Sequence, residues 1–305
     1  GNSLMAESVV VDQPRRSGVD AGRSQSRPSH SERNGKLTVK YNSSVGIGKF
    51  RRHARRLGSF ARVWCGAKTR STTFAGPLYA QIEPVSACNY SCKFCRDHAD
   101  AELTATTIGD GRKMMPLEVA EELANDLSRM GTLSVELIGR GEPLLHPRAA
   151  EFIELFRRRN MEVNLYTHGA LLNREWAKTL VRLGVRTLRL SMNAATPESH
   201  VGIDGAREGD FEKILDSARA LADARALAGT PVPYMLYGFV LLEQNYRDAK
   251  LAVQHAARSG MDAVLFKRLL MHEVSTPHAA RDPLALKAAL EEARQEAHRL
   301  GINTN

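Results

Sequence analysis

Short β-rich runs alternate with amphipathic helical stretches from residue 77 onward. In the helical stretches apolar residues recur at intervals of three and four positions, which is the spacing of one helix face. The pattern predicts six strands, at 78–83, 133–138, 162–167, 186–192, 232–241 and 262–267. Helices are predicted between them at 116–130, 148–160, 173–183, 210–227 and 245–259, followed by a last helix at 283–300.

Six alternations of strand and helix indicate parallel strands that are joined by right-handed crossovers. The helix at 116–130 is clearly delimited, because Pro116 stands at its first turn and Gly131 directly after its end. Two architectures fit this order: an open six-stranded βα barrel and a doubly wound sheet. Either one predicts a single α/β core over residues 77–305.

The first quarter of the chain follows a different pattern. Residues 1–48 are rich in Ser, Arg, Gly and Asn and poor in large apolar groups, so we expect a disordered basic leader. Residues 49–76 are expected to form a basic amphipathic helix and a linker, because apolar residues recur on one helical face from Phe50 to Trp64. This helix can pack on the outside of the following domain, or it can contact an anionic membrane surface or polyanion.

The formal net charge of +9 is concentrated in this N-terminal region. Through residue 75 the chain carries 15 Lys and Arg against 4 acids, whereas the rest carries 28 bases and 30 acids. The total alone suggests a nucleic-acid partner. Its distribution instead predicts a nearly neutral core that carries a basic N-terminal arm.

Three of the four cysteines, Cys88, Cys92 and Cys95, lie within eight residues, and Cys65 stands apart. Four cysteines in 305 residues do not form a disulfide scaffold, and their clustering is typical of a metal or cluster site in a reducing compartment. We interpret Cys65 as a bystander thiol. No apolar run reaches the roughly 18 residues of a membrane span and no secretory signal is visible, so we expect no transmembrane span and a cytoplasmic location.

Polar or glycine-containing segments follow the predicted strands directly. Ligands bind at the carboxyl ends of parallel strands, so these segments are the candidate site. The segments after the first four strands are 88–95, 139–143, 167–169 and 191–193; Lys267 and Arg268 follow the sixth.

The three clustered cysteines allow two interpretations. With His98 they can complete a four-ligand zinc site, and a zinc-stabilised module with a basic arm would bind nucleic acid. Alternatively they can hold a four-iron cluster that leaves one iron open. The glycine and acid at 141 and 142 favour the cluster, because a zinc module does not need them.

The spacing Cys88-x3-Cys92-x2-Cys95, with Phe94 before the last cysteine, resembles the radical S-adenosylmethionine (radical SAM) superfamily. The resemblance covers roughly residues 77–270 and continues through three further segments, in matching order. These are the Gly-Gly-Glu-Pro-like 139–143, the Thr-Asn-Gly-like 167–169 and the Ser-Leu-Asp-like 191–193, with Arg140, His168 and Asn193 as departures.

The resemblance implies a partial (βα)6 TIM-like barrel, a [4Fe–4S] cluster and S-adenosylmethionine (SAM). Cys88, Cys92 and Cys95 would be the cluster ligands. Glu142 would accept from the methionine ammonium, or else cap a helix. Cofactor-binding residues would also include Phe94, Gly141, Thr167, Ser191 and Asn193, the last two holding the carboxylate or ribose unless they only form a turn.

The implied activity is reductive cleavage of SAM to a 5′-deoxyadenosyl radical, which abstracts hydrogen from a substrate. That substrate would be a peptide or a small molecule such as a sugar, nucleoside or cofactor precursor, and the electron donor a flavodoxin or ferredoxin. Pro84 before the cysteine loop resembles the group that carries a C-terminal SPASM domain. Because no cysteine follows Cys95, we expect either that this domain is absent from a shortened chain or that one cluster suffices.

Overall fold

The structure is a computed structural model that describes residues 46–69, 74, 76–99, 114–269 and 275–305. The side chains of residues 46–56 are not described. Nearly all of the leader expected at 1–48 therefore lies outside the described residues, and its disorder stays a prediction. No helix within the described ranges is long and apolar enough to cross a membrane.

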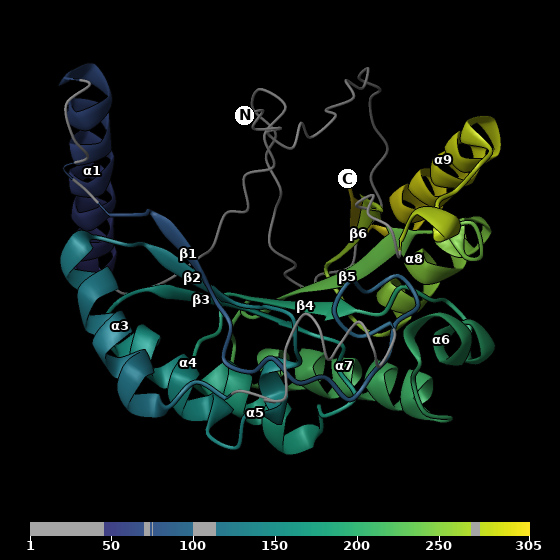
Figure 1. Ribbon diagram of the computed structural model, residues 1–305, viewed down its shortest axis with the longest axis horizontal. Coiled ribbons are helices and arrows are strands. Elements are labelled where there is room, and N and C mark those ends of the chain that lie inside the picture. The colour runs from purple at the N-terminus through teal and green to yellow at the C-terminus, as the bar shows by residue number, and fades with distance from the viewer. Residues whose placement is uncertain (1–45, 70–73, 75, 100–113, 270–274) are drawn as a thin grey trace, which may run out of the picture.

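The centre of the molecule is one sheet of seven strands, all parallel and hydrogen-bonded in the order of the chain. A doubly wound sheet reverses direction around its first strand, so the sequential order excludes that alternative. The sheet curves into an arch, as a partial TIM-like barrel does (Figure 1). Its strands are β1 (Tyr79–Ile82), β2 (Ser134–Leu137), β3 (Glu162–Thr167), β4 (Thr187–Ser191), β5 (Tyr234–Leu241), β6 (Ala263–Arg268) and β7 (Asn303–Thr304).

Helices α3, α4, α5 and α7 cover the convex outer side of the arch, and its concave side is free of labelled helices in Figure 1. All six helices predicted from residue 116 onward are present, and the short β7 and α6 were not predicted. The helices of this part are α3 (Leu117–Met130), α4 (Ala149–Arg158), α5 (Arg174–Arg182), α6 (Pro197–Asp204), α7 (Asp210–Leu227), α8 (Ala249–Arg258) and α9 (Pro283–Leu300).

Local sequence signals set the ends of these helices. Gly131 ends α3 in the left-handed conformation, with φ 88°, where a glycine avoids the Cβ clash. The side chain of Asn173 caps α5 by accepting from the amide of Trp176. Thr196 and Ser199 form a reciprocal capping box that starts α6, although this helix has only eight residues.

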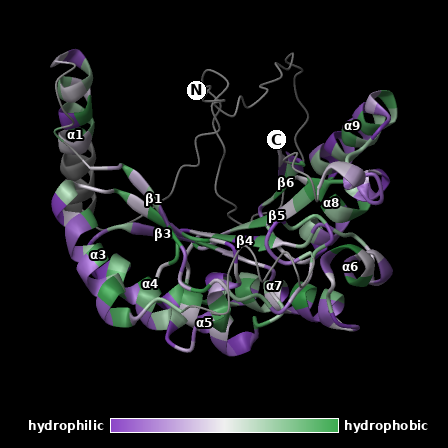
Figure 2. Ribbon diagram, in the orientation of Figure 1, coloured by the Kyte–Doolittle hydropathy of each residue, from purple (hydrophilic) through white to green (hydrophobic). Residues whose placement is uncertain are grey.

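The two faces of the sheet have opposite chemistry, because successive side chains of a strand alternate between them. Leu188, Leu190 and Phe239 point toward the helices and are fully buried in the main core. The alternate strand positions face the other side of the sheet. They include Tyr166 of β3 and Arg189 of β4, two polar residues that line a cavity. Figure 2 shows β5 as mainly hydrophobic, whereas the covering helices carry both hydrophilic and hydrophobic residues.

The basic helix predicted from residue 49 is present as α1 (Gly46–Thr69). It contacts the rest of the molecule through Ser59, which is fully buried and donates to the carbonyl of Gly131 at 2.9 Å. The predicted apolar face does not make this contact: the exposed fraction is 69% for Leu57 and 63% for Trp64. Periodicity identified the helix, but it could not identify the face that packs.

Candidate active site

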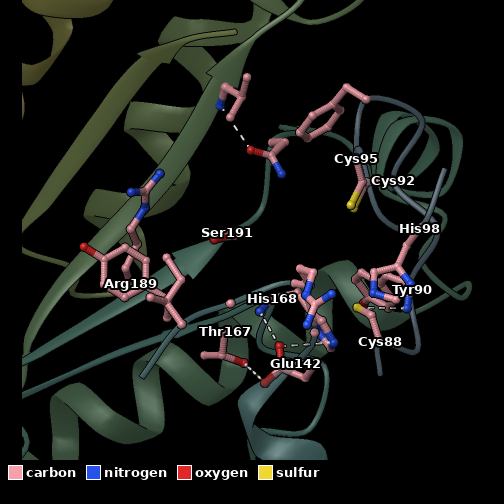
Figure 3. Close-up of a pocket in the computed structure, with 18 of the residues that line it drawn as sticks. Cys88, Tyr90, Cys92, Cys95, His98, Glu142, Thr167, His168, Arg189 and Ser191 are labelled. Atoms are coloured by element: carbon pink, nitrogen blue, oxygen red, sulfur yellow. Dashed lines mark hydrogen bonds and ion pairs between the residues drawn. The ribbon is translucent and has the colours of Figure 1, made fainter. Parts of the chain in front are cut away.

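The side chains that the sequence singled out meet at one cavity of about 400 Å³ beyond the carboxyl ends of the strands. The cysteine loop forms one wall, and Ser191 and Arg189 on β4 lie across from it (Figure 3). Four loops, which follow β1 to β4, supply the predicted residues. All nine line the cavity: Cys88, Cys92, Phe94, Cys95, Gly141, Glu142, Thr167, Ser191 and Asn193.

The three cysteine thiols of this loop are unpaired and partly buried. Burial raises the pKa of all three, to about 11 for Cys88, so without a metal they are neutral thiols. The amide of Tyr90 points at Cys88, with 3.5 Å between N and Sγ. Cys65 on α1 is exposed and does not line the cavity.

His98 lines the same cavity, but its Nε2 lies 3.2 Å from the carbonyl oxygen of Ser86. Within the described residues, no three His, Cys, Asp or Glu side chains converge on a point that would hold a single metal ion. The predicted zinc set of three cysteines and His98 is therefore not assembled here. A four-iron cluster distributes its thiolates over separate irons, so its ligands do not need a common centre.

Gly141 lies against the backbone of the cysteine loop. A Cβ atom at this position would be 2.3 Å from the carbonyl oxygen of Ala87 and 2.5 Å from that of Val85. The next amide, that of Glu142, donates to the same Ala87 oxygen at 2.9 Å. A side chain here would therefore push away the loop that carries Cys88.

Glu142 is 2% exposed and accepts hydrogen bonds from three neighbours. Its Oε1 accepts from the amide of Leu144 at 3.0 Å and from the hydroxyl of Thr167 at 2.7 Å. Its Oε2 accepts from the amide of His168 at 2.9 Å. The carboxylate thus caps a short 3-10 helix, Pro143–Leu145, which is the alternative the sequence left open, and it also faces the cavity.

His168 is held between Tyr90 and the loop after β3. The two rings stack with centroids 4.0 Å apart. Its Nδ1 accepts from the amide of Ala170 at 3.1 Å, so the proton of the neutral ring is on Nε2, which lies 2.8 Å from Oδ1 of Asn89. Burial lowers the pKa of His168, which favours this neutral form. His168 therefore joins the cysteine loop to the strand-three loop.

Ser191 and Asn193 differ in what their side chains do. Asn193 is 5% exposed with a positive φ of 37°, and both ends of its side-chain amide make a hydrogen bond. Nδ2 donates to Asp204 at 3.0 Å and Oδ1 accepts from the amide of Val240 at 3.1 Å. Both residues line the cavity: Ser191 ends β4 (Figure 3), and Asn193 also holds the turn that follows this strand.

Arg189, Tyr166 and Asp204 were not singled out from the sequence. Burial raises the pKa of Asp204 to about 8, and Asp204 lies beside Cys92. A signal for Arg189 was available: it is a charged residue between Leu188 and Leu190 in a buried strand. Charged residues are seldom buried without a partner. The predicted Lys267 and Arg268 do line the cavity.

The fold and site define a class of protein: a parallel half-barrel that presents a three-cysteine loop and polar strand ends to one cavity. The sequence model of the Radical SAM superfamily matches residues 82–266, more than half of the chain. The chain belongs to the radical SAM superfamily, as its motifs predicted.

Two curated proteins and one solved structure illustrate the similarity. A tungsten-containing aldehyde ferredoxin oxidoreductase cofactor-modifying protein from Pyrococcus furiosus is 28% identical over 196 residues, 63% of this chain and 51% of that protein. The PqqA peptide cyclase of Gluconobacter oxydans is 29% identical over 169 residues, 55% of this chain and 43% of the cyclase. The chain thus spans about half the length of the curated relatives it matches.

Among solved structures, Streptococcus suis SuiB bound to S-adenosylmethionine matches with a TM-score of 0.62 and 17% identity. The match covers 86% of this chain and 56% of SuiB. This likeness is one of fold.

Proposed function

We propose that this chain holds a [4Fe–4S] cluster through Cys88, Cys92 and Cys95 and binds SAM beside it for radical chemistry on an organic substrate. A [4Fe–4S] cluster and SAM are the cofactors of its superfamily. One observation carries the proposal: nine predicted residues from four successive strand ends line a single cavity. Bound together and reduced, the two cofactors would supply a 5′-deoxyadenosyl radical.

The residues present fit these cofactors. Three thiols on one loop are a donor set for iron, and binding as thiolates would remove the cost of burying them. The lack of a Cβ at Gly141 lets the cysteine loop lie against this segment, and Gly141 and Glu142 both line the cavity. A buried carboxylate accepts well from an ammonium group.

Each wall of the cavity has a proposed task. Glu142, already oriented by three donors, would accept from the methionine ammonium of SAM. Thr167 would fix that carboxylate, and Phe94 would line the adenine side of the loop. Ser191 would bind the ribose or carboxylate. Asn193 would act through the turn, because its amide is already hydrogen-bonded.

We propose a peptide as the substrate. The cavity of about 400 Å³ continues from the cysteine loop along β3 and β4 to β6, which leaves room for part of a peptide beside the cofactors. The name of one relative, PqqA peptide cyclase, also supports a peptide. Another relative, the probable GTP 3′,8-cyclase of Methanosarcina mazei, supports a nucleotide instead, and it is 27% identical over 144 residues. A one-electron donor such as a flavodoxin or ferredoxin would reduce the cluster in a reducing compartment, the cytoplasm.

Anaerobic reconstitution with iron and sulfide tests the cofactors. We expect about four irons per chain and formation of 5′-deoxyadenosine when SAM and a reductant are added. Cys92→Ala should abolish both, whereas Cys65→Ala, which removes the exposed thiol of α1, should change neither. Zinc in place of iron, with salt-sensitive binding to nucleic acid, would support the zinc alternative and overturn the proposal.

We further propose that α1 contacts an anionic lipid surface and that residues 49–76 are an appendage to a core at 77–305. Between residues 46 and 69 the chain has seven Lys and Arg and no acid. Leu57, Phe60 and Trp64 are exposed on the same helix. Cations near an anionic membrane contribute about 1 kcal/mol each, and exposed apolar side chains add to this.

Vesicle sedimentation tests this contact. The protein should bind vesicles that contain phosphatidylserine, release them in high salt, and not bind pure phosphatidylcholine. Trp64→Ala should weaken binding, whereas Val119→Ala, at an exposed apolar residue of α3, should not. Equal binding by both variants, or binding to RNA in preference to vesicles, would count against the lipid surface.

A further inference from the structure

Arg189 is a buried cation that the proposed cofactor chemistry does not use. It lies on β4 and lines the cavity, yet only 6% of its surface is exposed. Its Nε has no hydrogen-bond partner in the described part of the chain. The guanidinium instead stands over the ring of Tyr166, with 5.2 Å from Cζ to the ring centroid. Burial lowers the pKa of Arg189, and the Tyr166 hydroxyl and the charge of Glu136 offset part of the cost of burying this cation.

The neighbouring strand is shaped to admit this side chain. Gly238 on β5 is paired with Ser191 of β4, and a Cβ at Gly238 would lie 2.7 Å from Nε of Arg189. Any larger residue would displace the guanidinium. The position of the Arg189 side chain is therefore set by β4 and β5 together, and it differs from that of a flexible surface arginine.

The nearest acid on this face is committed to other partners. Glu136 accepts from the hydroxyl of Tyr166 at 2.7 Å through Oε1 and from the amide of Gln81 at 3.3 Å through Oε2. Within the residues that the structure covers, no carboxylate lies within ion-pair distance of Arg189. The described part of the protein thus supplies no direct counterion to Arg189.

A second cation faces the same space. Lys267 on β6 lines the cavity, and among the described residues it has no ion-pair partner either. Partial desolvation at the cavity wall, and then the charge of Arg189, lower the pKa of Lys267, although its side chain is largely exposed. The two cations therefore repel each other, and an anion bound between them would remove that repulsion.

We infer that Arg189 and Lys267 form a subsite for an oxyanion of the substrate, a carboxylate or a phosphate. The inference rests on the proposed function, because it places the substrate in the cavity assigned to SAM. The guanidinium offers a planar fork of donors, which matches two oxygens of one carboxylate or phosphate. Lys267 adds a mobile point charge. The subsite would hold the anionic end of the substrate beside Ser191, across the cavity from the cysteine loop (Figure 3).

Calorimetric titration of the reconstituted protein, with saturating SAM, tests the subsite with two probes: glutarate for a carboxylate and inorganic phosphate for a phosphate. At least one probe should bind with a stoichiometry of one, and the tighter of the two identifies the group. Arg189→Gln and Lys267→Gln should each weaken that binding by roughly 10- to 100-fold, the loss of one charged hydrogen bond. Arg258→Gln, which removes an exposed cation at the end of α8, is the matched control and should not weaken it.

Three outcomes would overturn the subsite: neither probe binds with or without SAM, the control variant loses as much affinity as the others, or a probe binds only when SAM is left out. The last would assign Arg189 to the carboxylate of SAM. Lys267→Gln keeps the test decisive if Arg189→Gln does not fold, because Lys267 lies exposed at a strand end. Formation of 5′-deoxyadenosine by the unaltered protein is measured separately. If 5′-deoxyadenosine forms but no probe binds, only the subsite is refuted. If no 5′-deoxyadenosine forms, the proposed function is refuted.

Discussion

Replacing Gly141 by alanine should displace the cysteine loop. The added Cβ would lie 2.3 Å from the carbonyl oxygen of Ala87, about 1 Å closer than the ordinary contact limit of 3.4 Å. The obstruction is backbone on both sides, since the carbonyl of Val85 is 2.5 Å away, so no flexible side chain can yield. The hydrogen bond from the amide of Glu142 to Ala87 would be lost in the same movement.

The expected loss of unfolding free energy follows from the steric overlap at residue 141 and from the lost hydrogen bond. Overpacking against fixed atoms costs about 1–3 kcal/mol, and one lost hydrogen bond about 1 kcal/mol. Together they give about 2–4 kcal/mol, which lowers Tm by roughly 5–15 °C for a domain of this size. Because Ala87 adjoins Cys88, we also expect the variant to take up substantially less iron than the unaltered protein.

Thermal unfolding of the metal-free protein and iron content after anaerobic reconstitution measure the two effects. Gly202→Ala is the control, since a Cβ there meets nothing within 4 Å and the site is helical. It should leave iron uptake unchanged and stabilise the fold by up to about 1 kcal/mol. If Gly141→Ala melts and binds iron as the unaltered protein does, the close approach at this glycine does not hold the loop.

Three further predictions concern other parts of the fold. Asn193→Ala removes the partner of Asp204 from a buried turn and should cost about 2–3 kcal/mol in chemical denaturation; an unchanged midpoint would refute the role of that turn. Ser59→Ala breaks the buried hydrogen bond that attaches α1 to the end of α3, so limited proteolysis should cut α1 faster; equal rates would contradict it. Arg299 above all lowers the pKa of Glu296 to about 2, below its ordinary 4.5. The ion pair of Glu296 and Arg299 therefore stabilises the fold above pH 4.5, and this contribution is lost as the pH falls toward 2. Glu296→Gln should flatten the decline of Tm in that pH range, and an unaltered decline would count against the ion pair.

Long, periodic elements and their end signals were predictable from the sequence. The six principal strands appear within about two residues of their expected positions, and Gly131 ends α3 as expected. The alternation of strands and helices did not by itself determine the strand order, because it fits both a barrel and a doubly wound sheet; the partial barrel was expected from the family resemblance, and it is confirmed. Only the pairing of β1 through β7 decides between them. The two-residue β7 and the eight-residue α6 are too short to show a period.

The site residues that belong to a sequence motif were predictable, whereas those that are placed by packing between strands were not. Cys88 and Glu142 lie in the loops after β1 and β2, and Ser191 ends β4, so the common direction of the strands brings them together. Arg189 could have been noticed as a charge within a buried strand, but its position against the missing Cβ of Gly238, about 50 residues further along the chain, could not be predicted. Which face of α1 is buried depends on one serine, Ser59, and no pattern of hydrophobicity indicates it.

The order of the strands in the sheet also sets the order in which the site can be completed during synthesis. Each strand pairs with the one made just before it, so folding can follow the ribosome from β1 to β7. The cysteine loop emerges first, and Asn193 follows almost 100 residues after Cys95. At 5–20 residues per second this interval lasts roughly 5–20 s. Throughout it the three thiols are made but not yet enclosed, and this is the period in which the nascent chain depends most on a reducing environment.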